Sequence, residues 1–461
     1  MAERFDAIVI GTGQSGPPLA VRLGKSGRKT AIIERAAFGG TCVNVGCTPT
    51  KAYVACARAA HVARHAADYG VHAGGEVSVD LAFVKARKDR IIGASRVGVE
   101  RWLRTAPNVS VFQGHARFAG PHVVQIAAAG APPVELEAPE IFINTGTRAL
   151  VPAIAGIDRI QYETNSTILE LTTLPSHLAI IGGSYIALEF AQIFRRFGSR
   201  VTVLVRGERL LSREDDDVAR AVQEVLAREG IEFRFGTEPR SVEPLAGGGV
   251  RIALDGESLD VSHLLCATGR IPNTDDLGLD AAGIARDKHG HIPVDGQLRT
   301  NVEGVWALGD INGRGAFTHT SYDDFQIVAA NLLDGANRSA DTRIPAWAVF
   351  VDPPLARVGM SEHEVRASGR PALIATMPMS RVGRARERGE TDGFMKALVD
   401  AQTKLILGAS IFGIEGDEAI HTFIDTMTAG APYTTLEFAM HVHPTVSELV
   451  PTLLDGLRPL Q

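Results

Sequence analysis

Short runs of apolar residues recur along the chain, and several are followed at once by glycines and a helical pattern. Residues 5–10 and 30–33 form two such runs, which predict strands buried on both faces of a parallel sheet. Pro17 and Pro18 lie between them, and because two prolines are tolerated only in the first turn of a helix, the helix begins there. The same order of strand, turn, helix and strand returns at residues 178–205. The pattern predicts two βαβ units of the dinucleotide-binding type.

The rest of the chain predicts helices mixed with short strands. Residues 51–68 and 76–105 have helical patterns, and the second of them is strongly charged. Strands are predicted at residues 109–112, 114–118, 123–126, 141–147, 305–308, 394–399 and 405–412. A chain of 461 residues is too long for one ordinary core and should divide into two to four domains. We expect these domains at residues 1–150, 151–269, 270–340 and 341–461, with a shift of composition near residue 341.

Glycines follow the first strand at the positions where a dinucleotide needs close approach to the backbone. Gly11, Gly13 and Gly16 have the spacing G-x-G-x-x-G, and Glu34 ends the next strand. The spacing alone is weak evidence, but its place between a strand and a helix, with an acidic residue after the second strand, makes the prediction strong. The glycines admit a pyrophosphate to the helix N-terminus, and Glu34 can bind a ribose hydroxyl.

The second unit departs from this fingerprint. Gly182 opens its turn, Ser184 stands where the second glycine belongs, and Ala187 is an accepted variant of the third. The Ser184 side chain lies close to the expected pyrophosphate, so we expect a slightly displaced cofactor rather than a lost site. The following strand ends in Arg206 rather than in an acidic residue, with Arg209 near. Because guanidinium groups accommodate a 2′-phosphate, the sequence favours NADPH over NADH.

Composition and charge narrow the class of protein. The formal net charge of −6 implies no general affinity for nucleic acid, and the arginine-rich residues 381–388 are interpreted as a solvated face. No apolar run approaches the roughly 18 residues of a membrane span, and no secretory signal precedes the first strand. We therefore expect a cytoplasmic protein without a membrane or nucleic-acid partner. In that reducing compartment a disulfide is more often catalytic than structural.

Two of the four cysteines lie in residues 39–51, GGTCVNVGCTPTK. Cys42 and Cys47 can form a disulfide only if their Cα atoms approach to about 4.4–6.8 Å, so the segment must bend, and Gly46 gives it the freedom to do so. Thr48 before Pro49 predicts a helix N-cap, which places Cys47 at a helix N-terminus. The helix dipole there favours a thiolate.

A reactive redox pair is the interpretation that we favour for these cysteines. A structural disulfide is the first alternative, although nothing suggests an oxidising compartment. A zinc site is the second, but it would need two further ligands, and Cys56 and Cys266 are far away in spacing and context. We expect no metal site, and we expect Cys56 and Cys266 to be packed and inert.

The cysteine segment resembles the active-site segment of the pyridine nucleotide–disulfide oxidoreductases, a family that includes dihydrolipoamide dehydrogenase, glutathione reductase and mercuric reductase. The stretches FRRFGSRVTV and HVHPTVSEL are most similar to the mercuric-reductase-like branch, which includes reactive-chlorine-resistance and copper-reductase relatives. The resemblance covers nearly the whole chain. It implies an α/β fold of two Rossmann-like domains, for FAD and NAD(P), and a C-terminal α/β dimerisation domain.

The resemblance also implies a set of cofactor contacts. Tyr185 would cover the flavin where nicotinamide docks and move aside as a gate, and Asn144 stands where the family has alanine. Asp310 would reach the FAD ribityl chain, and a helix starting after His319 would point its N-terminus at the flavin pyrimidine. The remaining cofactor residues implied are Gly40, Thr41, Lys51, Gly114, His115, Ala116, Thr145, Gly146, Gly269, Arg270, Gly309, Phe317 and Thr318.

The catalytic roles likewise follow from the resemblance. Electrons would pass from NADPH through FAD to the Cys42–Cys47 disulfide, with Cys47 nearer the flavin and Cys42 as the interchange thiol. Lys51 would pair with Glu189 beside the flavin. His443 and Glu448 within HPTVSE would serve the partner subunit's thiols as acid and base, which requires a homodimer with shared active sites. His441 is then a surface or interface residue.

The sequence leaves the electron acceptor open between a small-molecule disulfide and a soft metal ion, Hg(II) or Cu(II). The C-terminal vicinal cysteine pair and the N-terminal metal-binding domain of mercuric reductases have no counterpart here, so efficient mercury detoxification is not expected. A dihydrolipoamide dehydrogenase is the alternative enzyme, weakened by Arg206. A glutathione reductase is less favoured, since no basic glutathione-binding pattern is legible. A redox sensor with little turnover is the alternative outside the enzymes.

Overall fold

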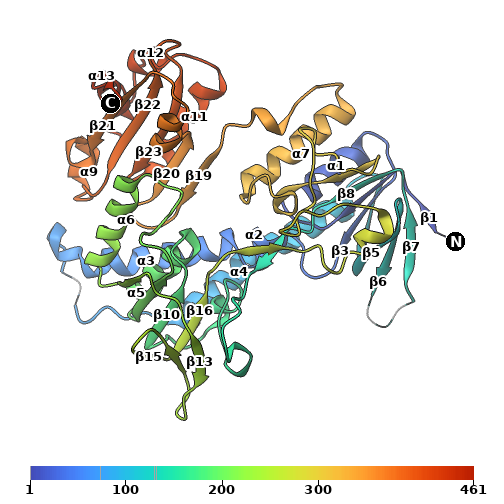
Figure 1. The fold of residues 1–461 in the computed structure, drawn as a ribbon, viewed down its shortest axis with the longest axis horizontal. Helices are drawn as coiled ribbons and strands as arrows, with labels where there is room; N and C mark the ends of the chain where they lie inside the picture. Colours follow the sequence, from blue (N-terminus) through green and yellow to red (C-terminus); the bar gives the residue numbers. More distant parts are fainter. Residues whose placement is uncertain (1, 73, 129, 131) are drawn as a thin grey trace.

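The computed structural model describes residues 2–72, 74–128, 130 and 132–461. Three sheet-centred bodies make up the molecule, and the two ends of the chain lie far apart, on different bodies (Figure 1). Among the described residues, no helix combines the length and apolar character that crossing a bilayer requires.

The first body is built on a five-stranded parallel sheet in the order β18-β8-β2-β3-β4. Its strands are β2 (Ala7–Ile10), β3 (Thr30–Glu34), β4 (Val109–Gln113), β8 (Glu140–Ile143) and β18 (Val305–Ala307). Because β18 returns from far along the chain to pair with β8, residues near 310 are delivered beside the first glycine turn. Helices α1 (Gly16–Lys25) and α7 (Thr318–Leu333) pack on one face through Leu19, Leu23 and Ile327.

A second sheet covers the other face of the first body. It has the order β1-β7-β6-β5 and consists of β1 (Glu3–Arg4), β5 (His115–Gly120), β6 (Val123–Ala127) and β7 (Val134–Glu137). Fully buried Ile8, Ile141 and Val124 form the core between the two sheets. This layer leaves the carboxyl ends of the parallel strands free to hold a ligand.

The second body repeats the plan with a four-stranded parallel sheet, β12-β11-β10-β16. The strands are β10 (His177–Ile181), β11 (Arg200–Val205), β12 (Glu232–Phe235) and β16 (His263–Cys266), with helices α5 (Tyr185–Phe197) and α6 (Asp216–Arg228). An antiparallel sheet of β13 (Ser241–Pro244), β14 (Val250–Ala253) and β15 (Ser258–Val261) covers the far side. The antiparallel pair β9 (Thr147–Ala149) and β17 (Arg270–Pro272) spans the crossing back to the first body.

The third body is a six-stranded antiparallel sheet in the order β19-β20-β23-β22-β21-β24. Its strands are β19 (Ala346–Val349), β20 (Leu355–Gly359), β21 (Ala372–Pro378), β22 (Phe394–Asp400), β23 (Ile406–Phe412) and β24 (Arg458–Pro459). The helices are α8 (Glu362–Ala367), α9 (Gly383–Glu387), α10 (Gly416–Ala419), α11 (His421–Thr428), α12 (Thr434–Glu437) and α13 (Val450–Asp455). In the arginine-rich run, Val382 and Ala385 are buried whereas Arg381 and Arg386 are exposed.

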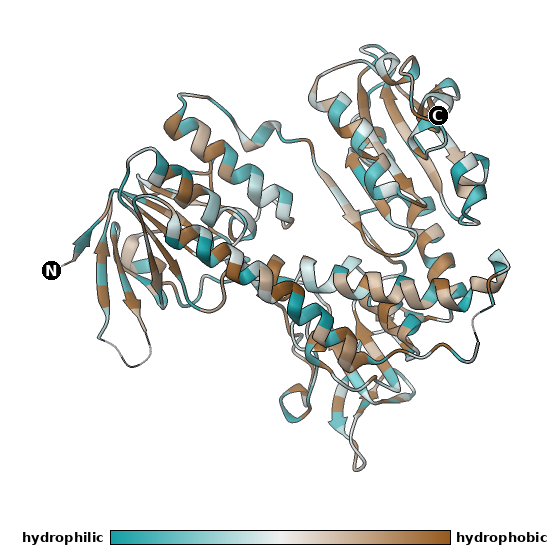
Figure 2. Ribbon diagram, turned by 180° about the vertical axis from the view of Figure 1, so that it is seen from behind, coloured by the Kyte–Doolittle hydropathy of each residue, from teal (hydrophilic) through white to brown (hydrophobic). Residues whose placement is uncertain are grey.

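The helices α2 (Gly40–Asn44), α3 (Cys47–Arg64) and α4 (Leu81–Thr105) follow the first glycine turn. Tyr53 and Ala57 of α3 are buried against Phe190 and Phe197 of α5, with 5.9 Å between the Tyr53 and Phe197 ring centroids. Apolar side chains therefore fix the first body to the second along α3. In each body, strands coloured as hydrophobic lie beneath helices (Figure 2).

Two predicted helix starts beside the site were wrong. Helix α3 begins at Cys47 with Gly46 as its N-cap, not with Thr48, because the Thr50 amide already donates to the Gly46 carbonyl. Helix α7 begins at Thr318 rather than after His319. Both changes bring a predicted site residue into the first turn of its helix.

Candidate active site

The bend at Val45 and Gly46 brings the two cysteines of residues 39–51 together. Cys42 lies in α2 and Cys47 is the first residue of α3; both are free thiols in this structure. Gly40 has a φ of +62°, and a Cβ there would lie 2.7 Å from the Gly13 Cα. The cysteine segment therefore sits directly on the glycine turn that follows β2, and only glycine permits that approach.

Asn44 and Asn165 hold the bend from outside, and neither was predicted to do so. The Asn44 Nδ2 group donates to the carbonyls of Phe38 and Gly40 at 3.0 and 2.8 Å, while its Oδ1 accepts from Arg96. The Asn165 Nδ2 group donates to the Val45 carbonyl at 2.8 Å. The sequence could have indicated Asn44, because it lies between the two cysteines. The Asn165 contact joins distant parts of the chain, so no sequence pattern indicates it.

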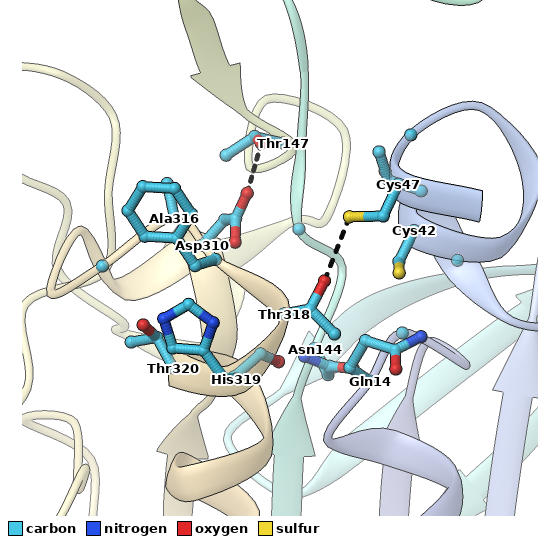
Figure 3. A pocket seen from close by; sticks show the side chains of 18 of the residues that line it. Gln14, Cys42, Cys47, Asn144, Thr147, Asp310, Ala316, Thr318, His319 and Thr320 are labelled. Carbon is cyan, nitrogen blue, oxygen red and sulfur yellow. Dashed lines mark hydrogen bonds between the residues drawn. The ribbon is translucent and has the colours of Figure 1, made fainter. Parts of the chain in front are cut away.

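The two thiols differ strongly in acidity. The hydrogen bond from Cys42 lowers the pKa of Cys47 to about 6, with help from the Thr318 hydroxyl and the Lys51 charge against the effect of burial. The same hydrogen bond, together with burial, raises the pKa of Cys42 far above its ordinary value. The Thr318 Oγ1 atom lies 3.3 Å from Cys47 Sγ (Figure 3). At neutral pH the pair therefore holds one thiolate, on Cys47, and one protonated thiol, on Cys42.

We expect the alkylation of Cys47 by iodoacetamide in the reduced protein to have its midpoint near pH 6. Because the pKa is lowered, the thiolate persists above that pH and is lost as the pH falls through it. Mass spectrometry of the separated Cys42 and Cys47 peptides would follow each thiol. A Cys47 midpoint near the ordinary thiol value of about 8.5 would contradict the electrostatic account.

Lys51 lies one turn after Cys47, and its Nζ is 2.7 Å from Glu189 Oε2. Glu189 is 4% exposed on α5, and its other oxygen accepts from the Phe350 amide at 2.9 Å. The Phe350 ring centroid is 4.6 Å from Lys51 Nζ. The ion pair implied by the resemblance is thus present and held by all three bodies, and Phe350 is a contributor that the sequence did not reveal.

A cavity of about 1640 Å³ opens at the carboxyl ends of the first parallel sheet and reaches the cysteines. Most residues predicted to touch FAD line it: Gly11, Gly13, Glu34, Gly40, Thr41, Lys51, Gly114, His115, Ala116, Thr145, Gly146, Tyr185, Arg270, Asp310, Phe317, Thr318 and His319. Gly16, Gly269 and Gly309 do not line it, and Gly16 and Gly309 pack directly behind its wall.

The chemistry of this wall fits a dinucleotide. A Cβ at Gly11 would lie 2.4 Å from the Asn144 carbonyl oxygen, so only glycine keeps the backbone open at the turn. The buried Glu34 carboxylate is oriented by the Thr12 and Ala36 amides at 3.0 and 2.8 Å. Asp310 accepts from the Thr147 hydroxyl at 2.9 Å (Figure 3). The residues present would hold an FAD molecule along this wall.

The glycine turn of the second body has a similar backbone but more exposed side chains. A Cβ at Gly182 would lie 2.3 Å from the Ala267 carbonyl oxygen, whereas Ser184 is exposed in an extended conformation that suits any residue. Arg206 is 84% exposed, with Glu238 3.7 Å away. Arg209 instead donates to the carbonyls of Ser212 and Glu214 within its own loop. Of the two arginines, Arg206 is therefore the one whose guanidinium is more available to a ligand.

Tyr185 lines the cavity at the start of α5, next to Phe317. The two ring centroids are 5.9 Å apart, and burial raises the pKa of the Tyr185 hydroxyl. Its position directly after the second glycine turn, beside the cavity, is compatible with the predicted gate, which stays a prediction.

His443 and Glu448 form a pair away from this cavity. His443 Nδ1 is 2.8 Å from Glu448 Oε2, so the ring donates from Nδ1 and presents Nε2 outward. The His443 side chain is 79% exposed and does not line the cavity. Phe438 and Met440, just before it, are 81% and 99% exposed. His441, by contrast, is half-buried, and its Nδ1 atom has no partner among the described residues.

Two dinucleotide-binding bodies that share a thiol pair define a flavin-linked, nicotinamide-linked thiol oxidoreductase. The chain belongs to the pyridine nucleotide-disulphide oxidoreductase family: residues 5–324 match the model of the family's main domain and residues 345–454 that of its dimerisation domain. The family is flavin-dependent and uses a pyridine nucleotide.

Several relatives match nearly the whole chain. A probable pyridine nucleotide-disulfide oxidoreductase, RclA of Escherichia coli, is 37% identical over 96% of this chain and 97% of its own. The dihydrolipoyl dehydrogenase of Cupriavidus necator is 34% identical, over 98% of this chain and 97% of its own, and the mercuric reductase of Streptomyces lividans is 33% identical, over 96% of this chain and 94% of its own. The solved Cu(II) complex of the HOCl-induced flavoprotein disulfide reductase RclA has a TM-score of 0.91 at 35% identity, and the alignment covers 99% of each chain.

Proposed function

We propose that this protein is an FAD-dependent, NADPH-preferring homodimeric reductase that delivers electrons through Cys42 and Cys47 to a disulfide or a soft metal ion. The observation that carries the proposal is the geometry at the end of the cavity, where Cys42 and Cys47 lie together beside the Thr318 hydroxyl and the Lys51–Glu189 ion pair. Bound FAD would supply two-electron transfer between the nicotinamide and the thiol pair. A reducing cytoplasm is the location that suits such a pair.

The roles of the two thiols follow from their environments. Cys42 is protonated, so it needs a base before its Sγ can attack one sulfur of an acceptor disulfide. The base takes the Cys42 proton and returns it to the departing thiolate. Cys47, already a thiolate, then attacks the mixed disulfide on Cys42, which restores the Cys42–Cys47 bond and releases the second acceptor sulfur as a thiolate. The Lys51 ammonium, fixed by Glu189, stabilises negative charge beside Cys47.

The base that we assign is His443 of the partner subunit. Within one chain His443 is oriented by Glu448 but lies off the cavity, so it can serve thiols only in another chain. The exposed Phe438 and Met440 beside it are the kind of apolar surface that a subunit interface covers. The dimerisation domain of the family lies in the same part of the chain.

The identity of the electron acceptor is the most specific part of the proposal. The RclA structure that resembles this chain is a Cu(II) complex, which favours Cu(II) as a metal acceptor. Oxidation of NADPH should be followed with Cu(II), Hg(II), lipoamide, glutathione disulfide, a quinone and dioxygen in parallel. Fast turnover with lipoamide and NADH would identify a dihydrolipoyl dehydrogenase instead. Slow turnover with every acceptor, despite normal reduction of the flavin by NADPH, would favour a redox sensor.

The nucleotide preference should depend on Arg206. Arg206→Gln is expected to lower kcat/KM for NADPH by about tenfold and to leave that for NADH unchanged, because one charge-assisted contact to a 2′-phosphate is lost. Arg213→Gln, on the exposed part of the same loop, is the matched control. A wild-type enzyme with a clear preference for NADH would overturn this assignment.

A further inference from the structure

Asn144 is part of the cavity wall, at a point where three parts of the first body meet (Figure 3). It follows β8 and is 6% exposed. Its Oδ1 accepts from the Gly16 amide at 3.2 Å, and its Nδ2 donates to the Leu308 carbonyl at 2.9 Å. Because both partners are backbone groups of fixed polarity, the orientation of the carboxamide is determined. One side chain thus joins the glycine turn of α1 to the strand end that carries Asp310.

The space around this carboxamide is made by glycines. A Cβ at Gly13 would lie 2.7 Å from Asn144 Oδ1, and a Cβ at Gly309 would lie 3.0 Å from Asn144 Nδ2. A Cβ at Gly16 would be 3.4 Å from Oδ1. Glycines from both flavin-binding turns therefore pack against a single amide, so its position sets the distance between the two turns.

A second branch leads from Asn144 to the thiol pair. The Nδ2 group also donates to the Ser15 hydroxyl at 3.1 Å, and Ser15 Oγ is 2.6 Å from Ser321 Oγ. Ser15 is fully buried and Ser321 is 6% exposed. Ser321 is one turn along α7 from Thr318, whose hydroxyl lies 3.3 Å from Cys47 Sγ. The network therefore ends on the same helical turn as the residue that contacts the thiol.

We propose that Asn144 is a positioning residue: it locks the phosphate-binding turn to the Leu308–Asp310 segment, and through Ser15 and Ser321 it sets the start of α7 against Cys47. The family segment that it resembles has alanine here, so the expected effect of its loss is quantitative. Buried polar networks fix geometry when every member is satisfied, as this one is.

The test uses the FAD-loaded protein and two readouts besides turnover. In Asn144→Ala, the rate of FAD release, followed by flavin fluorescence, should rise about tenfold, the consequence of leaving a buried amide unpaired. Asn312→Ala is the matched control, because Asn312 is equally buried and donates to Ala307 and Asp324 but not to the phosphate-binding turn. Equal rates of FAD release in the two variants, at equal losses of Tm, would overturn the proposal.

The second readout is the pH midpoint of Cys47 alkylation in the reduced protein. Ser321→Ala breaks only the branch to α7, so it should raise this midpoint by about half a pH unit and leave FAD release within about twofold of the wild type. The titratable groups that face Cys47, namely Cys42, Lys51 and Glu189, are unchanged in this variant. If the midpoint stayed at the wild-type pH in both Ser321→Ala and Asn144→Ala, the proposed connection from Asn144 to Cys47 would be wrong.

Discussion

Replacing Cys47 with serine should lower NADPH-dependent reduction of both disulfides and Cu(II) by about 10³-fold or more. The structure gives the reason: Cys47 is the thiol held as a thiolate by Cys42, Thr318 and Lys51, and a serine hydroxyl cannot close the bond to Cys42. Oxidation of NADPH followed in the presence of each acceptor measures the effect. The binding of FAD should be unaffected, because the cavity wall is otherwise intact.

Two further variants make this result specific. Cys56 lies on the same helix as Cys47, in a half-buried position off the cavity. The variant Cys56→Ser should therefore keep wild-type turnover. Cys42→Ser should match Cys47→Ser in the loss of acceptor reduction while leaving the Cys47 thiol in place. If Cys42→Ser retained disulfide or metal reduction, the assignment of Cys42 as the interchange thiol would be wrong.

The sequence revealed the two dinucleotide units because their signals are local. Glycine turns between apolar strands and proline-started helices depend on residues that are adjacent in the chain, so β2, β3, β10 and β11 lie where they were predicted. The strands β7 and β13–β15 were missed, since they are short and carry alternating charged residues such as those of β7, Val134–Glu137. Their stability comes from pairing with neighbours, which a single segment does not display.

The site divides in the same way. The cysteine pair, Lys51 and His443 were visible through their motifs, whereas the contacts that hold them come from far along the chain: Asn165 to Val45, Phe350 to Glu189, and Ser321 to Ser15. Arg209 shows the converse case, a charged residue near a predicted ligand whose guanidinium is already occupied by its own loop. The sequence shows which side chains can act chemically, but the fold determines which residues they contact.

His443→Ala should lower the turnover of an organic disulfide by about 10²–10⁴-fold, the usual contribution of a general acid–base group. Its effect should be largest on acceptors whose departing sulfur must be protonated, and smaller on Cu(II), which needs no proton. Glu448→Gln keeps the shape of the side chain but loses the charge that orients His443 Nδ1, so it should give a smaller loss in the same direction. The pH dependence of kcat/KM for each acceptor would separate these cases.

Mixed dimers decide whether His443 acts across the subunit boundary. Cys42→Ser chains keep an intact His443, and His443→Ala chains keep an intact thiol pair, so each homodimer should be nearly inactive. A mixed dimer contains one site in which the intact thiols of one chain meet the partner subunit's His443. Random exchange of equal amounts makes half of the dimers mixed, each with one of its two sites active, so about a quarter of wild-type activity should return. If His443 instead served its own chain, no site would be complete in any mixture, and the activity would stay at the level of the separate variants.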